Sequence, residues 1–229
     1  MVLAGTMLSV NASIYEQLED YPKALETEFK ALEVQQRIKN PLLIAKSYIN
    51  ISTKYFHLKE FQKALDYQNK ALEILLESTN KTTLAICYLN IGVSNMELSN
   101  YGPALENLNN ALSIARELNL LQEQARVLAD IADIYLTAPD DVLKKAVILP
   151  ENKLSESEKV YLESLKIATD IGASDIQISC WLGLSEVYER MNNYPQAYTA
   201  YKNSVSIKDS IAGDDVKKQI TRKEIQFEF

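Results

Sequence analysis

Few residues of this 229-residue chain have the chemistry of a catalytic or metal-binding group. His57 is the single histidine, which excludes zinc motifs built on two histidines. No two glycines have the spacing of a phosphate-binding loop. Acids are numerous, and paired carboxylates can perform general acid–base catalysis, but no spacing here marks a perturbed pair. We therefore expect no enzyme, no metal and no cofactor, and interpret the acids as a solvated face or as a wall for a basic ligand.

Composition and charge narrow the choice of partners. The chain is 47% hydrophobic and contains only six Gly and six Pro, which favours a helical globule with little or no strand. A net charge of −7 disfavours nucleic acid and anionic lipid, because both are polyanions. No apolar run approaches the roughly 20 residues of a spanning helix, and Met1 does not begin a secretory signal. We expect no nucleic-acid partner and no direct membrane insertion.

A repeat of about forty residues organises the chain. Large residues open one helical pattern in each copy, at Tyr21, Phe61, Tyr101, Leu154 and Tyr194. The steps between them are 40, 40, 53 and 40 residues, so the fourth copy carries an insertion, residues 137–153. Upstream of each anchor lies a second pattern with apolar offsets of three, four and seven, which indicates one helix face. Each copy is therefore predicted to be a helix A, a short turn and a helix B.

Small residues recur at three positions of every copy, one in helix A and two in helix B. They are Ala12, Ser52, Gly92, Ala132 and Ser185, then Ala24, Ala64, Ala104, Ser157 and Ala197, then Ala31, Ala71, Ala111, Ser164 and Ser204. Two helices approach to about 8 Å only where side chains are short, so helices A and B are predicted to cross at these sites. A plain helical bundle is the alternative fold, but it would not need the same small residues at a fixed interval.

This pattern resembles the tetratricopeptide family in a forty-residue variant, with an atypical first copy in which Asn11 replaces Leu. The resemblance implies an all-α, right-handed α-solenoid of five helix-turn-helix repeats plus a C-terminal helix, with helix A lining a concave groove. The expected repeats are residues 1–40, 41–80, 81–120, 121–173 and 174–211, followed by a helix over 212–229.

The family resemblance also predicts where a ligand would bind. In the family, an Asn beside the core stripe of helix A often grips the backbone of a bound peptide, and Asn50 and Asn90 match that position. An Asn bonding within its own scaffold is the alternative. The whole predicted groove set, in chain order, is Lys46, Asn50, Thr53, Asn90, Val93, Arg126, Asp130, Asp133 and Glu186. It changes from basic and polar to acidic, which could orient a dipolar peptide.

Two other features carry expectations. Cys87 and Cys180 occupy equivalent places in repeats three and five, on the order of 20 Å apart at a repeat spacing of ~10 Å, too far for a disulfide. We expect two buried free thiols. In the insertion, Asp141 is predicted to cap one short helix between Pro139 and Pro150, which either modulates binding or is inert.

The C-terminal residues resemble the junction in bacterial membrane-bound sensor kinases that carry such repeats. Lys218-Gln219-Ile220 and Phe227-Glu228 carry the likeness, and Val216, Ile220 and Phe227 form a narrow apolar seam. The resemblance implies a sensory region of a longer histidine-kinase-type signalling protein, lying outside the cytoplasmic membrane, with any kinase activity in sequence not present here.

The alternatives are a free-standing cytoplasmic adaptor and, third, an enzyme. The seam also leaves open a homodimer through the C-terminal helix. The sequence alone does not identify the bound protein or peptide, because groove residues read shape and charge.

Overall fold

The structure is a computed structural model that describes residues 2–146 and 148–227. Within those residues the chain forms eleven α-helices and one short 3-10 turn and no strand, so the all-α prediction is confirmed. None of the helices within these residues is long and apolar enough to cross a bilayer. The chain divides into two compact units, Met1–Glu123 and Gln124–Phe229, which are treated separately below.

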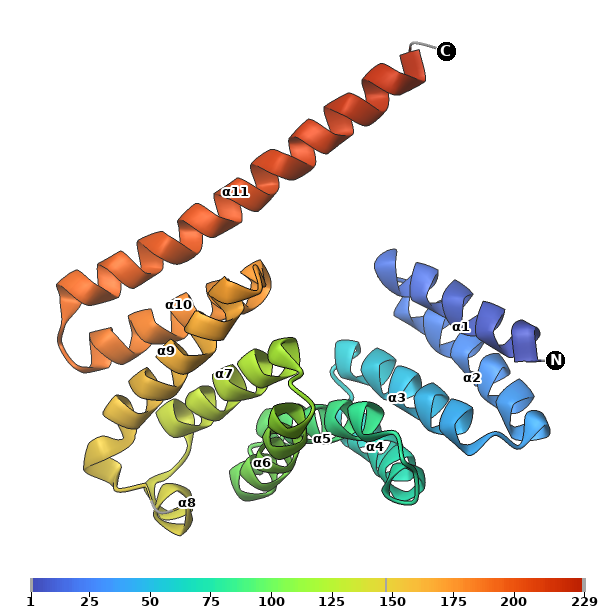
Figure 1. Cartoon of the computed structure of the whole chain (residues 1–229), viewed down its shortest axis with the longest axis horizontal. Coiled ribbons are helices and arrows are strands. Elements are labelled where there is room, and N and C mark those ends of the chain that lie inside the picture. Colours follow the sequence, from blue (N-terminus) through green and yellow to red (C-terminus); the bar gives the residue numbers. More distant parts are fainter. Residues whose placement is uncertain (1, 147, 228–229) are drawn as a thin grey trace. The chain divides into compact units, whose positions relative to one another are not determined.

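Unit 1 consists of three helical hairpins (Figure 1). Its helices are α1 (Val2–Gln17), α2 (Tyr21–Ile38), α3 (Pro41–His57), α4 (Phe61–Leu76), α5 (Lys81–Glu97) and α6 (Tyr101–Glu117). Within each hairpin the helices run side by side, and α2 also contacts α3 as α4 contacts α5. Helix B therefore packs both on its own helix A and on the helix A that follows.

The turn between helix A and helix B is the same in several copies. A non-glycine residue adopts the left-handed conformation at Glu19, Lys59, Ser99 and Asn192, with φ of 58° or 59°. Its N–H donates to the carbonyl three residues earlier, and the next N–H donates to the carbonyl five residues earlier. These two bonds satisfy carbonyls that the end of helix A leaves unpaired.

Burial supports the predicted crossing sites. Of the small positions, those on helix B are all buried, and on helix A Ser185 alone is half-buried while the other four are buried. Gly92 shows why size matters, because a Cβ there would lie 2.7 Å from Leu108 Cδ2. Close approach of helix A to helix B therefore depends on the residue type that the repeat preserves.

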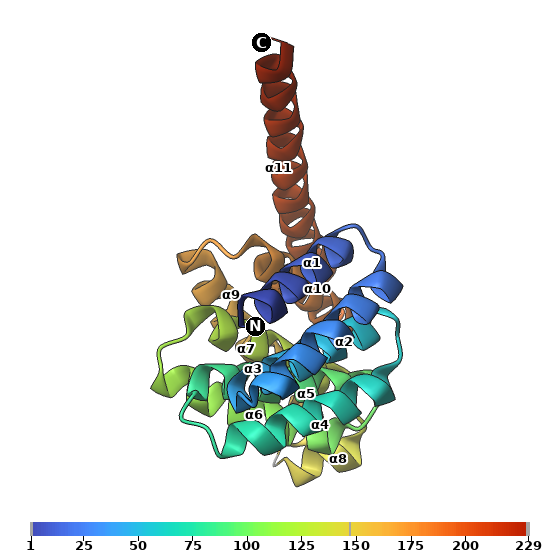
Figure 2. The same ribbon diagram turned by 90° about the vertical axis from the view of Figure 1, so that its right-hand side faces the viewer.

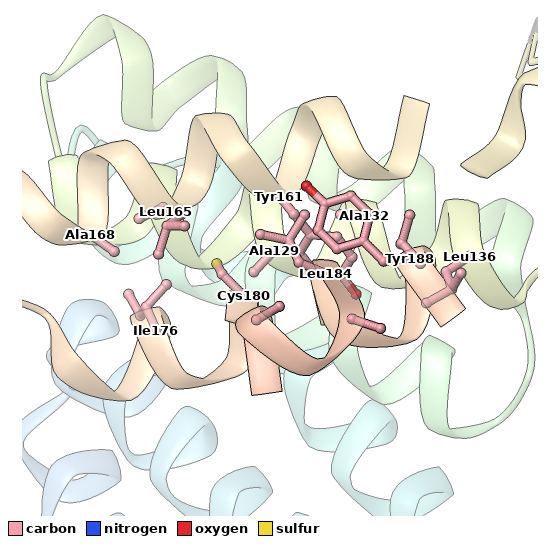
Figure 3. Packing of buried hydrophobic residues seen from close by; sticks show 14 residues of the cluster. Ala129, Ala132, Leu136, Tyr161, Leu165, Ala168, Ile176, Cys180, Leu184 and Tyr188 are labelled. Atoms are coloured by element: carbon pink, nitrogen blue, oxygen red, sulfur yellow. The ribbon is translucent and has the colours of Figure 1, made fainter. Parts of the chain in front are cut away.

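Unit 2 contains the rest of α7 (Leu121–Thr137), α8 (Asp140–Lys145), the turn Pro150–Asn152, α9 (Lys153–Asp170), α10 (Ser174–Arg190) and α11 (Tyr194–Phe227). Its core joins α7, α9, α10 and α11 around Tyr161, Leu184 and Cys180 (Figure 3). Two serines also link α9 to α7: Ser157 and Ser164 donate hydrogen bonds to the carbonyls of Ala132 and Ala125 at 2.9 and 2.6 Å.

The insertion forms the short helix α8, as predicted between the two prolines. The predicted cap is wrong: the helix begins at Asp140, so Asp141 lies in its first turn and no side chain caps it. Pro139 holds the N-cap position instead, with the extended backbone that proline favours. Leu143 anchors the insertion, because its side chain is fully buried.

The last helix of unit 2 continues past its repeat. α11 runs unbroken for 34 residues and extends beyond the end of α10 (Figures 1 and 2). Side chains from residue 214 onward lie outside what the structure describes, and the predicted seam of Val216, Ile220 and Phe227 falls among them. The C-terminal helix is therefore the continuation of the fifth helix B.

Candidate functional site

In unit 1, the predicted groove residue Asn50 already has a partner inside the fold. Its Nδ2 donates to Glu28 Oε1 on α2 at 3.2 Å, and Ser9 Oγ on α1 donates to the same oxygen at 3.1 Å. Burial raises the pKa of Glu28, while these hydrogen bonds lower it in part. Asn50 thus helps to accommodate a buried acid, and this bond uses one of the two N–H donors of its amide.

The other groove positions of unit 1 are more available. Lys46 is exposed, and Asn90 and Val93 are half-buried. Thr53 Oγ1 donates back to the carbonyl of Ile49 at 3.1 Å. Among the residues described, the side chain of Asn90 has no hydrogen-bond partner, so its donor and acceptor both remain for a peptide backbone. Asn90 is the groove amide of unit 1 that best fits the predicted role.

Two residues of unit 1 that sequence reasoning missed are Glu28 and Lys54. Both side chains are buried, and Lys54 Nζ forms an ion pair with Glu16 Oε2 on α1 at 2.7 Å. The signal was available for Glu28, since an acid between the small residues Ala24 and Ala31 lies on the face of helix B that packs inward. A solvent-open hollow of 460 Å³ near Leu42, Asn80 and Leu118 coincides with none of the groove positions.

Unit 2 brings together three of the predicted acids, Asp130 and Asp133 on α7 and Glu186 on α10, here called the acidic cluster. Asp133 Oδ1 accepts a short hydrogen bond from the hydroxyl of Tyr161 on α9. Burial is the main reason that the pKa of Asp133 is raised; the Tyr161 bond opposes this and the charge of Glu186 adds to it. The acidic cluster therefore combines carboxylates from two helices, and the Tyr161 hydroxyl binds one of them.

Asp130 is the unusual member of the acidic cluster. Its Oδ2 is fully buried and accepts no hydrogen bond within the described part of the chain. The pKa of Asp130 is raised to about 8, mainly by burial and in part by the charge of Asp133, while the charge of Arg126 opposes the rise. A buried carboxylate without a partner is unfavourable, so this oxygen is the group in unit 2 that a cation would stabilise most.

Gly183 holds, in the fifth repeat, the position that Asn50 and Asn90 hold in the second and third, and the structure gives the reason. A Cβ at Gly183 would lie 2.2 Å from Cζ of Tyr161. The Tyr161 ring, which is buried, therefore needs the empty space of a glycine on α10 (Figure 3). A tyrosine hydroxyl from helix B therefore lies close to the position that an Asn side chain holds in other repeats, and sequence reasoning missed Tyr161.

Two arginines at the edge of the acidic cluster already form ion pairs, one of them with Glu186 of the cluster. Arg126 forms an ion pair with Asp175 at 3.2 Å, and Glu186 forms one with Arg190 at 2.5 Å. The four side chains are 42–66% exposed, so each ion pair contributes little to stability. Arg190 also donates to the carbonyl of Leu136 at 2.8 Å. Neither ion pair at this edge of the acidic cluster is buried.

The two cysteines are buried thiols, as predicted. Burial raises the pKa of Cys87 to about 12 and that of Cys180 to about 11. Cys180 Sγ also donates to Ser164 Oγ at 3.1 Å. Neither thiol is activated as a nucleophile. Within the residues described, no group of three metal-ligating side chains occurs.

Comparison with known families agrees with the helix-pair repeat. Residues 3–77 match the tetratricopeptide repeat family. Residues 48–125 match the family described as anaphase-promoting complex subunit 5. None of the curated proteins matches the chain significantly. Nothing in these matches supports or tests the likeness of the C-terminal residues to a sensor kinase.

Solved structures share the fold at low identity. BtubC (BKLC) from P. vanneervenii has a TM-score of 0.71 and 18% identity, over 90% of this chain and 80% of that one. A Rap protein complexed with competence and sporulation factor has a TM-score of 0.74 and 16% identity, over 90% and 54%. The Rap conjugation gene regulator of plasmid pLS20, in complex with the Phr* peptide, has 0.69 and 14%, over 91% and 54%. The chain thus spans about half of each of these Rap proteins, and the similarity establishes the fold.

Proposed function

On the premise that this chain is a tetratricopeptide-type repeat protein, matched to the family over residues 3–77, we propose that it is a non-catalytic domain that binds a protein or peptide. In unit 2 the ligand's Lys, Arg or terminal amine binds at Asp130 and Asp133. One observation carries this proposal: Asp130 Oδ2 is fully buried without a hydrogen-bond partner, beside a second carboxylate.

The chemistry of the acidic cluster supports a cationic ligand. A cation beside Asp130 would supply the missing partner of Oδ2 and offset the repulsion between Asp130 and Asp133. Tyr161 keeps Asp133 in place through its hydroxyl, so a ligand meets a carboxylate that is already oriented. Two of the Rap structures with this fold contain a bound factor or peptide, which makes a peptide our first choice of ligand.

The predicted groove residues of unit 1 are proposed as a separate set with a different task. Asn90 would pair with the N–H and C=O of an extended peptide, and Lys46 would attract a carboxylate. Asn50 and Thr53 would contribute less, because each already makes a hydrogen bond within the scaffold. Val93 would add an apolar contact.

A peptide array tests the ligand class. Nine-residue peptides that carry one Lys or Arg are compared with the same peptides carrying norleucine or citrulline, and the tightest binder is measured by titration calorimetry. We expect Asp130→Asn to weaken binding of the basic peptide at least tenfold, about 1.4 kcal/mol. The matched control is Asp170→Asn, an exposed acid on α9, which should leave affinity unchanged. Equal affinity of Asp130→Asn and the unaltered protein would contradict the proposal.

The role in bacterial signalling, of the histidine-kinase sensor type, is a second proposal, and the length of α11 favours it. A helix that begins in the fifth repeat and continues past α10 could pass a change in that repeat to a following module. Hydrogen exchange tests this with the basic peptide described above. Peptide binding should change amide protection in residues 201–213. Unchanged protection there would favour the alternative, a free-standing adaptor.

A further inference from the structure

One face of α11 is exposed although it is aromatic. Tyr194, Tyr198 and Tyr201 lie three and four residues apart, so they share one side of the helix, and they are 62%, 69% and 54% exposed. Large aromatic side chains grouped on a surface mark interaction sites more often than isolated ones do. Within the part of the chain that the structure describes, nothing covers this face, here called the tyrosine face.

In the earlier repeats, the helix B face equivalent to the tyrosine face is buried. The residues equivalent to Tyr201, forty residues apart except across the insertion, are Glu28, Gln68, Leu108 and Tyr161, and all are at most 2% exposed. Glu28 bonds to Asn50 on the following helix A, and Tyr161 lies against Gly183 on the following helix A. The tyrosine face therefore occupies the place where a helix B receives the next helix A.

The first helix exposes the opposite half of that contact. On α1, Met7, Val10 and Ile14 are 66%, 60% and 49% exposed, and they too share one helix face. The equivalents of Met7 and Ile14 in the other four repeats are at most 2% exposed, at Ser47, Cys87, Val127 and Cys180 and at Lys54, Ser94, Ile134 and Val187. Where such a residue meets the preceding helix B the contact is close, as between Cys87 Sγ and the carbonyl of Gln68 at 3.5 Å.

From these two half-contacts we infer that the chain associates head to tail with a second copy of itself. The Met7 face of α1 in one molecule packs on the tyrosine face of α11 in another, as α3 packs on α2 and α5 on α4. The Met7 face suits a tyrosine-rich partner, since Met7, Val10 and Ile14 carry no charge and Glu16 is the one ionisable side chain between Ala4 and Gln17 apart from Tyr15. Such a contact joins two different surfaces, so it leaves one of each free and can propagate.

The contact is small, and its strength follows from that. A single helix placed on another buries less than the standard interface of about 1,600 Å², so association is expected in the micromolar range and rises with concentration. Sedimentation velocity from 1 to 200 µM, probe concentrations chosen to span that range, should show the average mass increasing. A monomer at every concentration would overturn the inference.

Two charge variants separate this arrangement from a symmetric dimer. Met7→Glu blocks the head, Tyr201→Glu blocks the tail, and each variant alone should be monomeric. An equimolar mixture should form a 1:1 dimer and nothing larger, because one free head then meets one free tail. Leu76→Glu, at a residue 60% exposed on α4 and on neither face, is the matched control and should associate like the unaltered protein.

Other outcomes identify other arrangements and overturn this one. Loss of association with Tyr201→Glu but not with Met7→Glu would show two α11 helices pairing, which is the homodimer that the sequence left open. Because a charged variant can also unfold, a second measurement uses Met7→Cys in one molecule and Tyr201→Cys in another. Mild oxidation of their mixture should give a crosslinked pair, and the native Cys87 and Cys180 are buried and should not react. No crosslink in the mixture would contradict the head-to-tail contact.

Discussion

Asp130 combines a buried oxygen with a partly exposed residue, and this makes ligand binding depend on pH. Its pKa of about 8 means that, without a ligand, the Asp130 carboxyl carries a proton at neutral pH. A bound cation lowers that pKa, so binding releases a proton. We predict that affinity for a basic peptide falls up to tenfold per pH unit as pH drops from 8 to 6.

Titration calorimetry in buffers of different ionisation enthalpy measures the released proton directly. Asp130→Asn should remove most of the dependence. Affinity that is flat from pH 6 to pH 8 in the unaltered protein would show that Asp130 does not contact the ligand's charge.

The Asp130 carboxyl makes stability depend on pH in the opposite direction from ligand affinity. The folded pKa lies above the ordinary value of 3.8, so between about pH 4 and pH 8 the folded state binds more protons than the unfolded state. Stability without ligand is therefore greatest at or below the lower value and decreases as pH rises towards 8. Asp130→Asn should reduce this loss, and at pH 8 it should be more stable than the unaltered protein by more than about 1 kcal/mol in urea titrations. The reverse order of stability would contradict the cause given for the pKa.

Gly183 is a residue whose missing side chain is structural. Gly183→Ala places a methyl group 2.2 Å from Cζ of the buried Tyr161 ring, so the ring or α10 must shift and we predict a loss of about 1–3 kcal/mol. Thermal unfolding measures it. Gly102→Ala is the control, since a Cβ there meets nothing within 4 Å and should be neutral or slightly stabilising. Similar losses for the two variants would mean that the Tyr161 contact is not the reason.

At the scale of elements, α1 is held to α3 by charge as well as by apolar packing. Lys54 is buried and pairs with Glu16, and it also lowers the pKa of Glu28. Removing the lysine leaves the buried Glu28 without its cation and leaves Glu16 with His57 at 3.6 Å, so Lys54→Met should cost about 3 kcal/mol of unfolding free energy and expose the amides of α1 to exchange. Lys30→Met breaks an exposed pair with Glu26 and should cost less than about 0.5 kcal/mol. Equal costs would rule out a special role for the buried pair.

The elements themselves could be predicted from the sequence because residue size sets how closely helices approach. Helix B begins at Tyr21, Phe61, Tyr101 and Tyr194 as the anchors predicted, and one residue before Leu154. The sequence indicated which face of helix A lines the groove. It did not indicate which polar groups on that face lack a hydrogen bond within the fold. The amide of Asn50 is used by Glu28, which comes from a different helix, and no periodicity within α3 contains that information. Tyr161 was missed for the same reason, since its partner Asp133 lies 28 residues earlier.

At the scale of the whole molecule, the charge of −7 affects how fast a basic partner binds. Long-range attraction raises the association rate and is screened beyond about 10 Å at 0.1 M salt. We predict that the association rate of a Lys- or Arg-containing peptide falls severalfold between 20 and 200 mM salt, the range in which screening grows strongly, as measured by stopped flow. Asp130→Asn should mainly raise the dissociation rate and keep the salt dependence. An association rate independent of salt would show that short-range contacts alone control binding.

The identical turns after helix A make forty residues a unit that the chain can lose. Glu60 and Asn100 precede helix B with nearly the same backbone, φ −90° and ψ 60° against φ −84° and ψ 61°. Deleting residues 61–100 would therefore join Glu60 to Tyr101 without a new turn conformation. One side-chain contact becomes unfavourable. Ser52 would then lie at the position where Gly92 now leaves room for Leu108. We predict that the deletion unfolds at a lower temperature than the same deletion with Leu108→Gln, which restores the combination of Ser on helix A and Gln on helix B found at the buried Ser52 and Gln68 of the second repeat. At this junction the contact of residue 52 with residue 108, and not the turn backbone, is therefore expected to limit the loss of a repeat.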